Sequence, residues 1–213
     1  MNVITRNRVR MIGVPDGRPM VFAHGFGCDQ EMWRLLAPAF TTDHRVVLFD
    51  HVGSGRSDLS AYDPVTYGLL DGYAADVVEI CAELALDDVV FVGHSVSAMI
   101  GVLAAARAPD VFGALVMVGP NPRYVDDRDY TGGFSREDIA ALLESLDSNQ
   151  LGWSAALAPV VMGNPDRPGL TAELADSFCR TDPDIARQFA RVTFLSDNRD
   201  DLPGVRVPTL VLQ

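Results

Sequence analysis

The sequence has few basic residues and no long apolar run, and each shortage argues against a class of protein. Seventeen basic residues stand against 29 acidic ones, so the net charge is −12 at pH 7. Because nucleic acids and anionic membranes attract basic surfaces, this balance argues against either as a partner. An acidic surface that keeps the protein soluble explains the charge, and an acidic face that docks a partner stays open.

Cysteine is also scarce. Only three cysteines occur, and no two have the C-x-x-C spacing. The odd number argues against a disulfide framework, and the spacing argues against a zinc site. We therefore expect no metal and no cofactor. No run is long enough to span a bilayer, and the opening stretch MNVITRNRVRMIGV lacks the apolar segment of a secretory signal. These observations favour a cytoplasmic protein.

Six short apolar runs indicate a parallel β-sheet. The chain of 213 residues is 48% hydrophobic, enough for one domain with a sizeable core. The runs are rich in β-branched residues, as strands buried on both faces are. They are Val9–Val14, which is expected at an edge, Pro19–His24, Arg45–Asp50, Asp88–Gly93, Ala114–Gly119 and Val207–Leu212. Helical periodicity between them, as in Asp71–Leu84, predicts a doubly wound α/β fold.

Residues 121–195 have a different pattern. They contain no strand-like run, but Ser135 and Asp138 have the spacing of a capping box, and Asp182-Pro183 is typical of a helix start. We expect an α/β core over 1–120, a helical lid over 121–195, and a resumed core with one strand over 196–213. An insertion at the carboxyl ends of the strands would cover the crevice where α/β proteins bind ligands.

The stretch FVGHSVSAMIG, residues 91–101, suggests a nucleophile. Its G-x-S-x pattern lies where a strand meets a helix, as in the G-x-S-x-G elbow, although Ser97 replaces the second glycine. In such an elbow Ser95 would be exposed, and the Val96 N–H would face a developing oxyanion. The alternative is an ordinary serine N-cap.

Two glycine-containing loops flank this elbow in the predicted sheet. HGFG, residues 24–27, follows a strand and would supply the Phe26 N–H as a second oxyanion donor, unless it is only a glycine-rich turn. DHVGSGRSD, residues 50–58, contains G-x-G but lacks the third glycine of a dinucleotide fingerprint. We interpret it as a structural turn beside the elbow.

Several stretches together resemble one family. They are FAHGFGCDQEMW, VVLFDHVGSGRSDLSAYD, LDGYAADV, FVGHSVSAMIG, LVMVGPNPRY and RTDPDIARQFA. They look like the RsbQ-type α/β-hydrolases of a bacterial stress pathway that controls an alternative sigma factor, whose relatives are the plant karrikin and strigolactone receptors. The resemblance runs along essentially the whole chain. It implies an α/β-hydrolase fold with a mostly parallel sheet and an inserted helical lid.

The resemblance also implies roles for particular residues. Ser95 would be the nucleophile, and Phe26 and Val96 would donate the oxyanion-hole N–H groups. An apolar pocket under the lid would be lined by Phe26, Tyr124, Phe134, Leu142, Trp153 and Phe194. Ordinary core filling is the alternative for each aromatic residue.

A histidine base for Ser95 is missing from the sequence. A serine hydroxyl needs such a base, and in this fold the acid and then the histidine follow the nucleophile. All four histidines precede Ser95. His24 is the nearest substitute, His44 belongs at the amino end of its strand, and His94 is expected to brace the turn.

We therefore expect the triad acid and base, and the last strands, to follow Gln213 in a longer protein. The resemblance places the acid just after the strand 207–212 and the histidine later still. Asp126 or Asp127 could replace the acid, but without a base that would be idle. We expect the 213 residues alone to be nearly inactive, and prone to aggregate through the apolar edge of the final strand.

Three functions follow. The first is a serine hydrolase of a small hydrophobic ester or lactone. The second is a non-catalytic small-molecule receptor that activates a partner phosphatase, with a PAS-domain phosphatase implied by the resemblance. The third is a scaffold with a degenerate triad.

Overall fold

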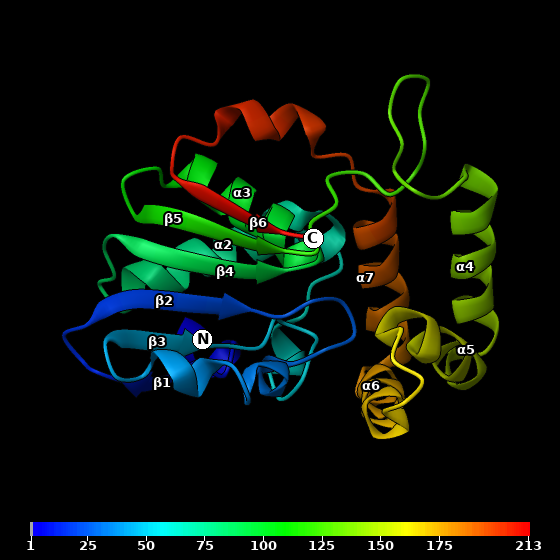
Figure 1. Ribbon diagram of the computed structural model, residues 1–213, viewed down its shortest axis with the longest axis horizontal. Coiled ribbons are helices and arrows are strands. Elements are labelled where there is room, and N and C mark those ends of the chain that lie inside the picture. The colour runs from blue at the N-terminus through cyan, green and yellow to red at the C-terminus, as the bar shows by residue number, and fades with distance from the viewer. Residues whose placement is uncertain (1) are drawn as a thin grey trace.

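The centre of the molecule is a six-stranded sheet. The computed structural model describes residues 2–213, and Figure 1 shows the sheet with a group of helices to one side of it. The strand order is β1-β3-β2-β4-β5-β6, and β1 is the antiparallel strand at one edge. The strands are β1 Arg10–Gly13, β2 Arg18–Ala23, β3 His44–Leu48, β4 Val89–His94, β5 Phe112–Val118 and β6 Thr209–Leu212.

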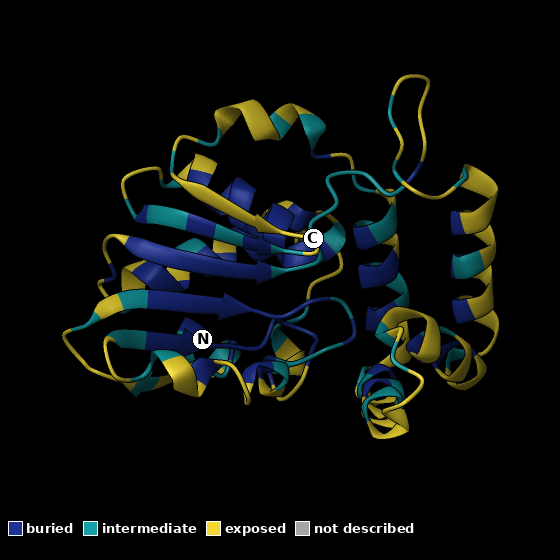
Figure 2. Cartoon of the chain, viewed as in Figure 1, coloured by how far each residue is buried: buried dark blue, intermediate teal, exposed yellow. Residues whose placement is uncertain are grey.

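The central strands are buried on both faces, as their continuous apolar sequences predict. In β4 the first five residues, VVFVG, are all buried, and β2 is buried over its last four residues. Figure 2 shows most of β2 and β4 in dark blue, the colour of buried residues, and β6 at the edge in yellow, the colour of exposed ones. Each strand starts and ends within about two residues of its predicted range, and the doubly wound α/β prediction is confirmed.

Helices α2 (Leu70–Glu83) and α3 (Val96–Arg107) pack against each other and against one face of the sheet. Helix α2 buries an apolar stripe that includes Val77 and Ile80, as the helical periodicity of this stretch predicts. Helix α3 is buried over ten consecutive residues from Val96 to Ala105. Its first turn therefore lies against the core, beside the end of β4.

Four helices are inserted between β5 and β6. They are α4 Arg136–Ser148, α5 Gln150–Met162, α6 Pro168–Arg180 and α7 Pro183–Leu195, and Figure 1 shows them as a separate layer beyond the strand ends. The predicted capping box is present, because Ser135 and Asp138 bond each other's backbone amides. Asp182 caps α7, also as predicted. The division into core, lid and resumed core stays a prediction.

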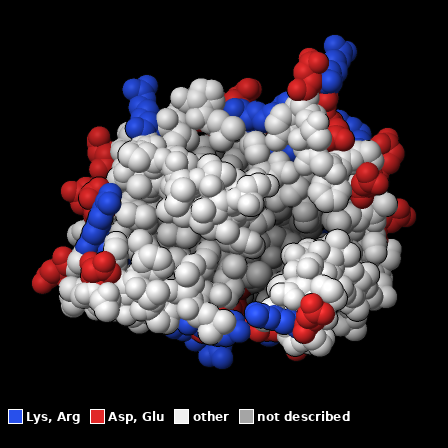
Figure 3. All heavy atoms as spheres, in the orientation of Figure 1, with Lys and Arg blue, Asp and Glu red and all other residues white. Residues whose placement is uncertain are grey.

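Strand β6 forms the second edge of the sheet. Three of its side chains are about half exposed, those of Leu210, Val211 and Leu212. Figure 3 shows this face of the molecule with its charged side chains at the rim and uncharged residues at the centre. The expected tendency to aggregate through this edge stays a prediction. Within residues 2–213, no helix has the length and apolar character needed to cross a membrane.

Phe189 on α7 joins the inserted helices to the core. Its ring is 2% exposed, stacks on Tyr73 of α2 at 4.7 Å, and lies 5.6 Å from the Phe26 ring. The same ring therefore belongs to the core under α2 and to the wall that the insertion makes over the strand ends.

We predict that Phe189→Ala lowers the free energy of unfolding by about 3–5 kcal/mol, because it leaves a cavity between two packed layers. Urea unfolding measures the loss. Val160→Ala is the matched control, since Val160 is 75% exposed on α5, and it should change stability by less than about 0.5 kcal/mol. A loss below about 1 kcal/mol for Phe189→Ala would show that the junction does not depend on this ring.

Candidate active site

Ser95 occupies a sharp turn between β4 and α3. Strand β4 ends at His94 and helix α3 begins at Val96, so a single residue makes the connection. Ser95 has φ 55° and ψ −122°, a conformation that non-glycine residues rarely adopt and that costs of order 1–3 kcal/mol. Its side chain caps no helix amide. The N-cap alternative for Ser95 is therefore wrong.

Two glycines let the backbone close around this turn. A Cβ on Gly93 would lie 2.4 Å from the Ser97 carbonyl oxygen, and a Cβ on Gly25 would lie 2.5 Å from His94 Nδ1. Both distances are far below van der Waals contact. The loop after β2 can therefore approach Ser95 only because residue 25 has no side chain.

Two backbone amides beside Ser95 have no acceptor. Within residues 2–213, neither the Phe26 N–H nor the Val96 N–H donates a hydrogen bond. Val96 is the first residue of α3, where an N–H has no acceptor within the helix, and two unpaired amides next to a serine hydroxyl form a potential anion site. They are the two amides that the sequence predicts for an oxyanion hole. That role stays a prediction.

Ser97, which replaces the usual second glycine, forms hydrogen bonds to residues of two different loops. Its hydroxyl donates to the His24 carbonyl oxygen at 2.5 Å, so it must accept from His51 Nε2 at 2.8 Å. The His51 amide in turn donates to His24 Nε2 at 3.1 Å. The start of α3 is thus tied to the loops after β2 and β3, directly beneath Gly25 and Phe26.

No base lies beside Ser95 in the described part of the chain. The Ser95 Oγ has one side-chain partner, the Tyr124 hydroxyl at 3.3 Å. Burial raises the pKa of Tyr124 and outweighs the lowering effect of its bond to Ser95, so Tyr124 keeps its proton near neutral pH. It cannot accept the serine proton readily.

His24 is not free to act as a base either. Its Nδ1–H donates to the Gly25 carbonyl at 2.9 Å, and its Nε2 accepts from the His51 amide. Both ring nitrogens are therefore occupied. His44 opens β3, at the end of the sheet away from Ser95, as expected. Asp126 binds the amides of Gly132 and Gly133, which gives it a structural role in a surface loop.

Three histidines near the elbow are kept neutral by burial. Desolvation lowers the pKa of His24, of His94 and, most strongly, of His51. The ring of His94 packs edge-on against Trp33 at 6.4 Å. His51 Nδ1 and His94 Nδ1 are buried without a hydrogen-bond partner. The three neutral rings therefore form a buried support under the turn.

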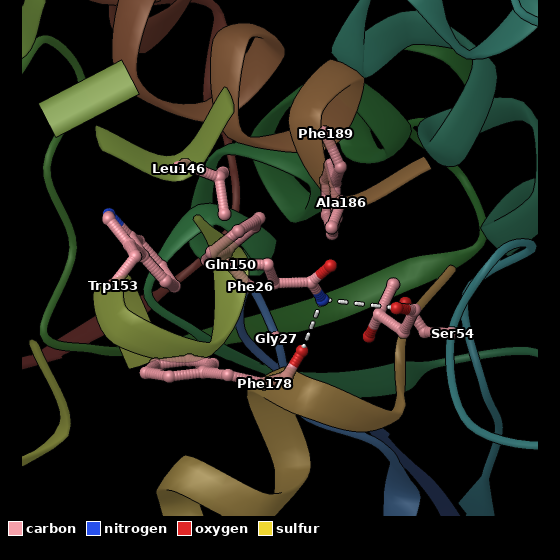
Figure 4. A pocket seen from close by; sticks show the side chains of 10 residues that line it. Phe26, Gly27, Ser54, Leu146, Gln150, Trp153, Phe178, Ala186 and Phe189 are labelled. Carbon is pink, nitrogen blue, oxygen red and sulfur yellow. Dashed lines mark hydrogen bonds between the residues drawn. The ribbon is translucent and has the colours of Figure 1, made fainter. Parts of the chain in front are cut away.

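A narrow cavity lies between the core and the inserted helices. The free space between its walls is at most about the size of one water molecule. Figure 4 shows its aromatic rings around Gln150. It is lined by Phe26, Gly27, Ser54, Leu146, Gln150, Trp153, Phe178, Thr181, Ala186 and Phe189.

The predicted pocket residues fall into two groups. Phe26 and Trp153 line this cavity, with ring centroids 6.0 Å apart. Phe194 packs between the rings of Phe26, at 5.8 Å, and Tyr124, at 5.2 Å, and so connects the cavity wall to the neighbour of Ser95. These four rings form one aromatic cluster. Their binding role stays a prediction.

The other two predicted residues lie away from the cavity. Phe134 is 41% exposed and sits 6.5 Å from the Tyr124 ring. Leu142 packs against the buried cluster of the inserted helices and does not line the cavity. If they contact a ligand, they do so at its edge or after the insertion moves.

Sequence reasoning missed the polar residues of the wall, Ser54, Gln150 and Thr181. Ser54 belongs to the G-x-G turn after β3, where Asp50 accepts the amides of Gln30 and Arg56. The prediction of a structural turn is therefore correct but incomplete, because the same turn presents Ser54 to the cavity. Gln150 opens α5, and no local pattern shows which way that residue points. Within residues 2–213, no group of three His, Cys, Asp or Glu is arranged to hold a metal ion.

Comparison with known proteins identifies the family. The alpha/beta hydrolase fold profile matches residues 18–155, and the chain belongs to this family. It is 40% identical over 207 residues to the Karrikin insensitive 2 receptor CA of Petunia hybrida, covering 97% of this chain and 76% of the relative. It is 39% identical to the Strigolactone esterase D14 of Arabidopsis thaliana, covering 100% and 79%.

Solved structures give the same fold. The hydrolase olei00960 from Oleispira antarctica superposes with a TM-score of 0.95 at 41% identity, over 99% of this chain and 77% of that one. The bromoperoxidase from Bacillus anthracis has a TM-score of 0.85 at 19% identity, over 95% and 75%, and this similarity supports the fold alone. The predicted α/β-hydrolase fold is therefore confirmed.

We predict that Gly93→Ala lowers the free energy of unfolding by about 2–3 kcal/mol, because the new methyl group would overlap the Ser97 carbonyl. Thermal and urea unfolding measure the effect. Gly169→Ala in α6 is the control, since no atom lies within 4 Å of the added Cβ, and alanine should be neutral or favourable there. Equal stabilities for both variants would contradict the close approach at the elbow.

We also predict that stability falls as the pH drops below about 6.5. The unfolded chain then protonates its histidines, whereas His24, His51 and His94 stay neutral in the folded protein. Each lowered pKa costs up to about 1.4 kcal/mol of stability per pH unit below 6.5, until the folded-state pKa is reached. Urea unfolding at pH 7.5, 6.5 and 5.5 measures the decline. A free energy of unfolding that does not change with pH would contradict three neutral buried rings. The His94→Gln variant should lose less stability than the wild type over the same pH range.

Proposed function

We propose that this α/β hydrolase binds a small, neutral, mostly apolar ester or lactone and that Ser95 is its nucleophile. The observation that carries the proposal is the strained Ser95 turn beside two unbonded amides, those of Phe26 and Val96. Strained residues cluster at functional sites, and unpaired amides at the start of a helix favour an anion. The relatives named as strigolactone esterases support an ester or lactone as the substrate class.

The proposed chemistry is acyl transfer. The Ser95 Oγ attacks the carbonyl carbon, and the carbonyl oxygen becomes an oxyanion that accepts from the Phe26 and Val96 amides. The C–O bond to the leaving alcohol then breaks, and water hydrolyses the acyl-enzyme. The Oγ proton must pass to a base. The described residues place only the Tyr124 hydroxyl beside Oγ, so a protein of these 213 residues should turn over slowly.

The inserted helices α4–α7 would act as a lid over this site. The cavity beneath them is too tight for an aryl ester in its present form, so binding requires a shift of α5 or α6. Polar contacts hold α6 to the core, including Ser177 Oγ to the Gly27 carbonyl at 2.7 Å and the Arg34–Glu173 ion pair. Those contacts lie next to Phe26, so lid movement would also affect the oxyanion loop.

A receptor is the second candidate, and a specific observation favours it. Three relatives are named as karrikin insensitive 2 receptors. A receptor needs only the cavity and a movable lid. The stress-signalling role and the PAS-domain phosphatase implied by the RsbQ resemblance stay predictions. Capture of such a phosphatase that depends on ligand, and is lost on substitution of outer lid residues, would test them.

We predict that phenylboronic acid forms a tetrahedral adduct with Ser95: boron accepts the Oγ, the Oγ proton passes to the buffer, and an oxygen on boron lies between the Phe26 and Val96 amides. Boron-11 NMR separates trigonal from tetrahedral boron. The tetrahedral signal should appear with the wild-type protein and disappear with Ser95→Ala. Ser148→Ala is the control, since Ser148 is exposed on α4, and it should keep the signal.

The same samples separate the two candidates. A protein that binds a neutral aryl ester but never gives tetrahedral boron would contradict the nucleophile and favour a receptor. Equal tetrahedral signals from wild type and Ser95→Ala would place the reaction elsewhere. With p-nitrophenyl acetate, we expect the 213 residues alone to give a rate close to that of Ser95→Ala, because none of residues 2–213 places a base beside the Oγ.

A further inference from the structure

We propose that Gln150 and Ser54 form a polar subsite that selects ligands carrying a neutral hydroxyl remote from the reacting carbonyl. The inference rests on the proposed ester- or lactone-binding function and names a feature of its substrate. Both residues line the cavity, although one opens α5 and the other lies in the turn after β3. They face a wall that is otherwise mostly apolar.

The Gln150 side chain has one atom left for a ligand. Its Nε2 donates to the Phe178 carbonyl at 2.9 Å and to the Thr181 carbonyl at 3.1 Å, which uses both amide hydrogens. Carbonyl oxygens cannot donate, so these two bonds fix which end of the amide is nitrogen. The Oε1 then has no donor within residues 2–213. Figure 4 shows Gln150 in the middle of the lining side chains.

Ser54 offers a second unpaired group. The residue is 3% exposed, and its backbone is fixed, because its amide donates to the His51 carbonyl and its own carbonyl accepts from the Ser57 amide. Its hydroxyl makes no hydrogen bond to any described residue, yet it borders the cavity. A ligand that covers this hydroxyl without bonding to it loses free energy, whereas a ligand that forms a hydrogen bond to it does not.

These two groups define the chemistry of what they bind. Gln150 Oε1 is an acceptor, and the Ser54 hydroxyl can both donate and accept. A ligand hydroxyl can donate to Oε1 and can also pair with the Ser54 hydroxyl, whereas a ligand carbonyl leaves Oε1 unpaired. No charged side chain lines the cavity, so an ionised group would be desolvated without compensation. The free space is about the size of one water molecule, which suits a hydroxyl in place of that water.

The test is a pair of esters of matched size, 4-hydroxyphenyl acetate and 4-methylphenyl acetate. Affinities are measured by titration calorimetry in a Ser95→Ala background, so that neither ester is consumed. We expect the hydroxylated ester to bind about tenfold more tightly, because the methyl group would cover the two polar groups without bonding to them. Adding Ser54→Ala should reduce this ratio to less than about threefold.

Further variants separate the subsite from general damage. Gln150→Met should also remove the preference, and its melting temperature checks for loss of the bonds to Phe178 and Thr181. Ser148→Ala should leave the ratio unchanged. Equal affinity for the two esters, or a ratio that Ser54→Ala does not alter, overturns the subsite and leaves the proposed function standing. If neither ester binds while phenylboronic acid still reacts with Ser95, the subsite also fails. If neither ester nor the boronic acid binds, both proposals fail.

Discussion

The closeness of three backbone segments around Ser95 is the constraint on which the rest of the site depends. The end of β4, the first turn of α3 and the loop after β2 meet where a Cβ on Gly93 or Gly25 would collide with a neighbour. The chain therefore turns through a conformation that costs Ser95 free energy. In return, the amides of Phe26 and Val96 stay unbonded at the same place.

The buried polar network beneath this turn explains why the motif tolerates Ser97. Its hydroxyl joins the His24 carbonyl to the His51 ring, so α3 is fastened to two neighbouring loops in a dry environment. Above the turn, the Phe26 ring belongs to the cavity wall and touches Trp153, Phe178, Phe189 and Phe194. One residue thus couples the candidate oxyanion amide to the packing of the inserted helices.

Much of the fold could be predicted, because local sequence determines it. Strands such as β4 are continuous apolar runs that fit only a doubly buried sheet, and the Ser135–Asp138 capping box fixes the start of α4. The cavity wall could not be predicted as well. Phe134 is largely outside it, and Gln150 is inside it, because the packing of α5 against α6 decides which side chains point inward. An aromatic residue in the sequence is expected to be buried, but the sequence does not show which neighbour its side chain packs against.

The most direct measurement of the central claim is a high-resolution crystal structure of the protein. The account predicts that Ser95 has a φ near 55° and that an ordered water or anion lies within about 3 Å of both the Phe26 and Val96 amide nitrogens. A Ser95 in an ordinary helical or extended conformation, with its hydroxyl capping α3 and the two amides bonded to protein carbonyls, would contradict it.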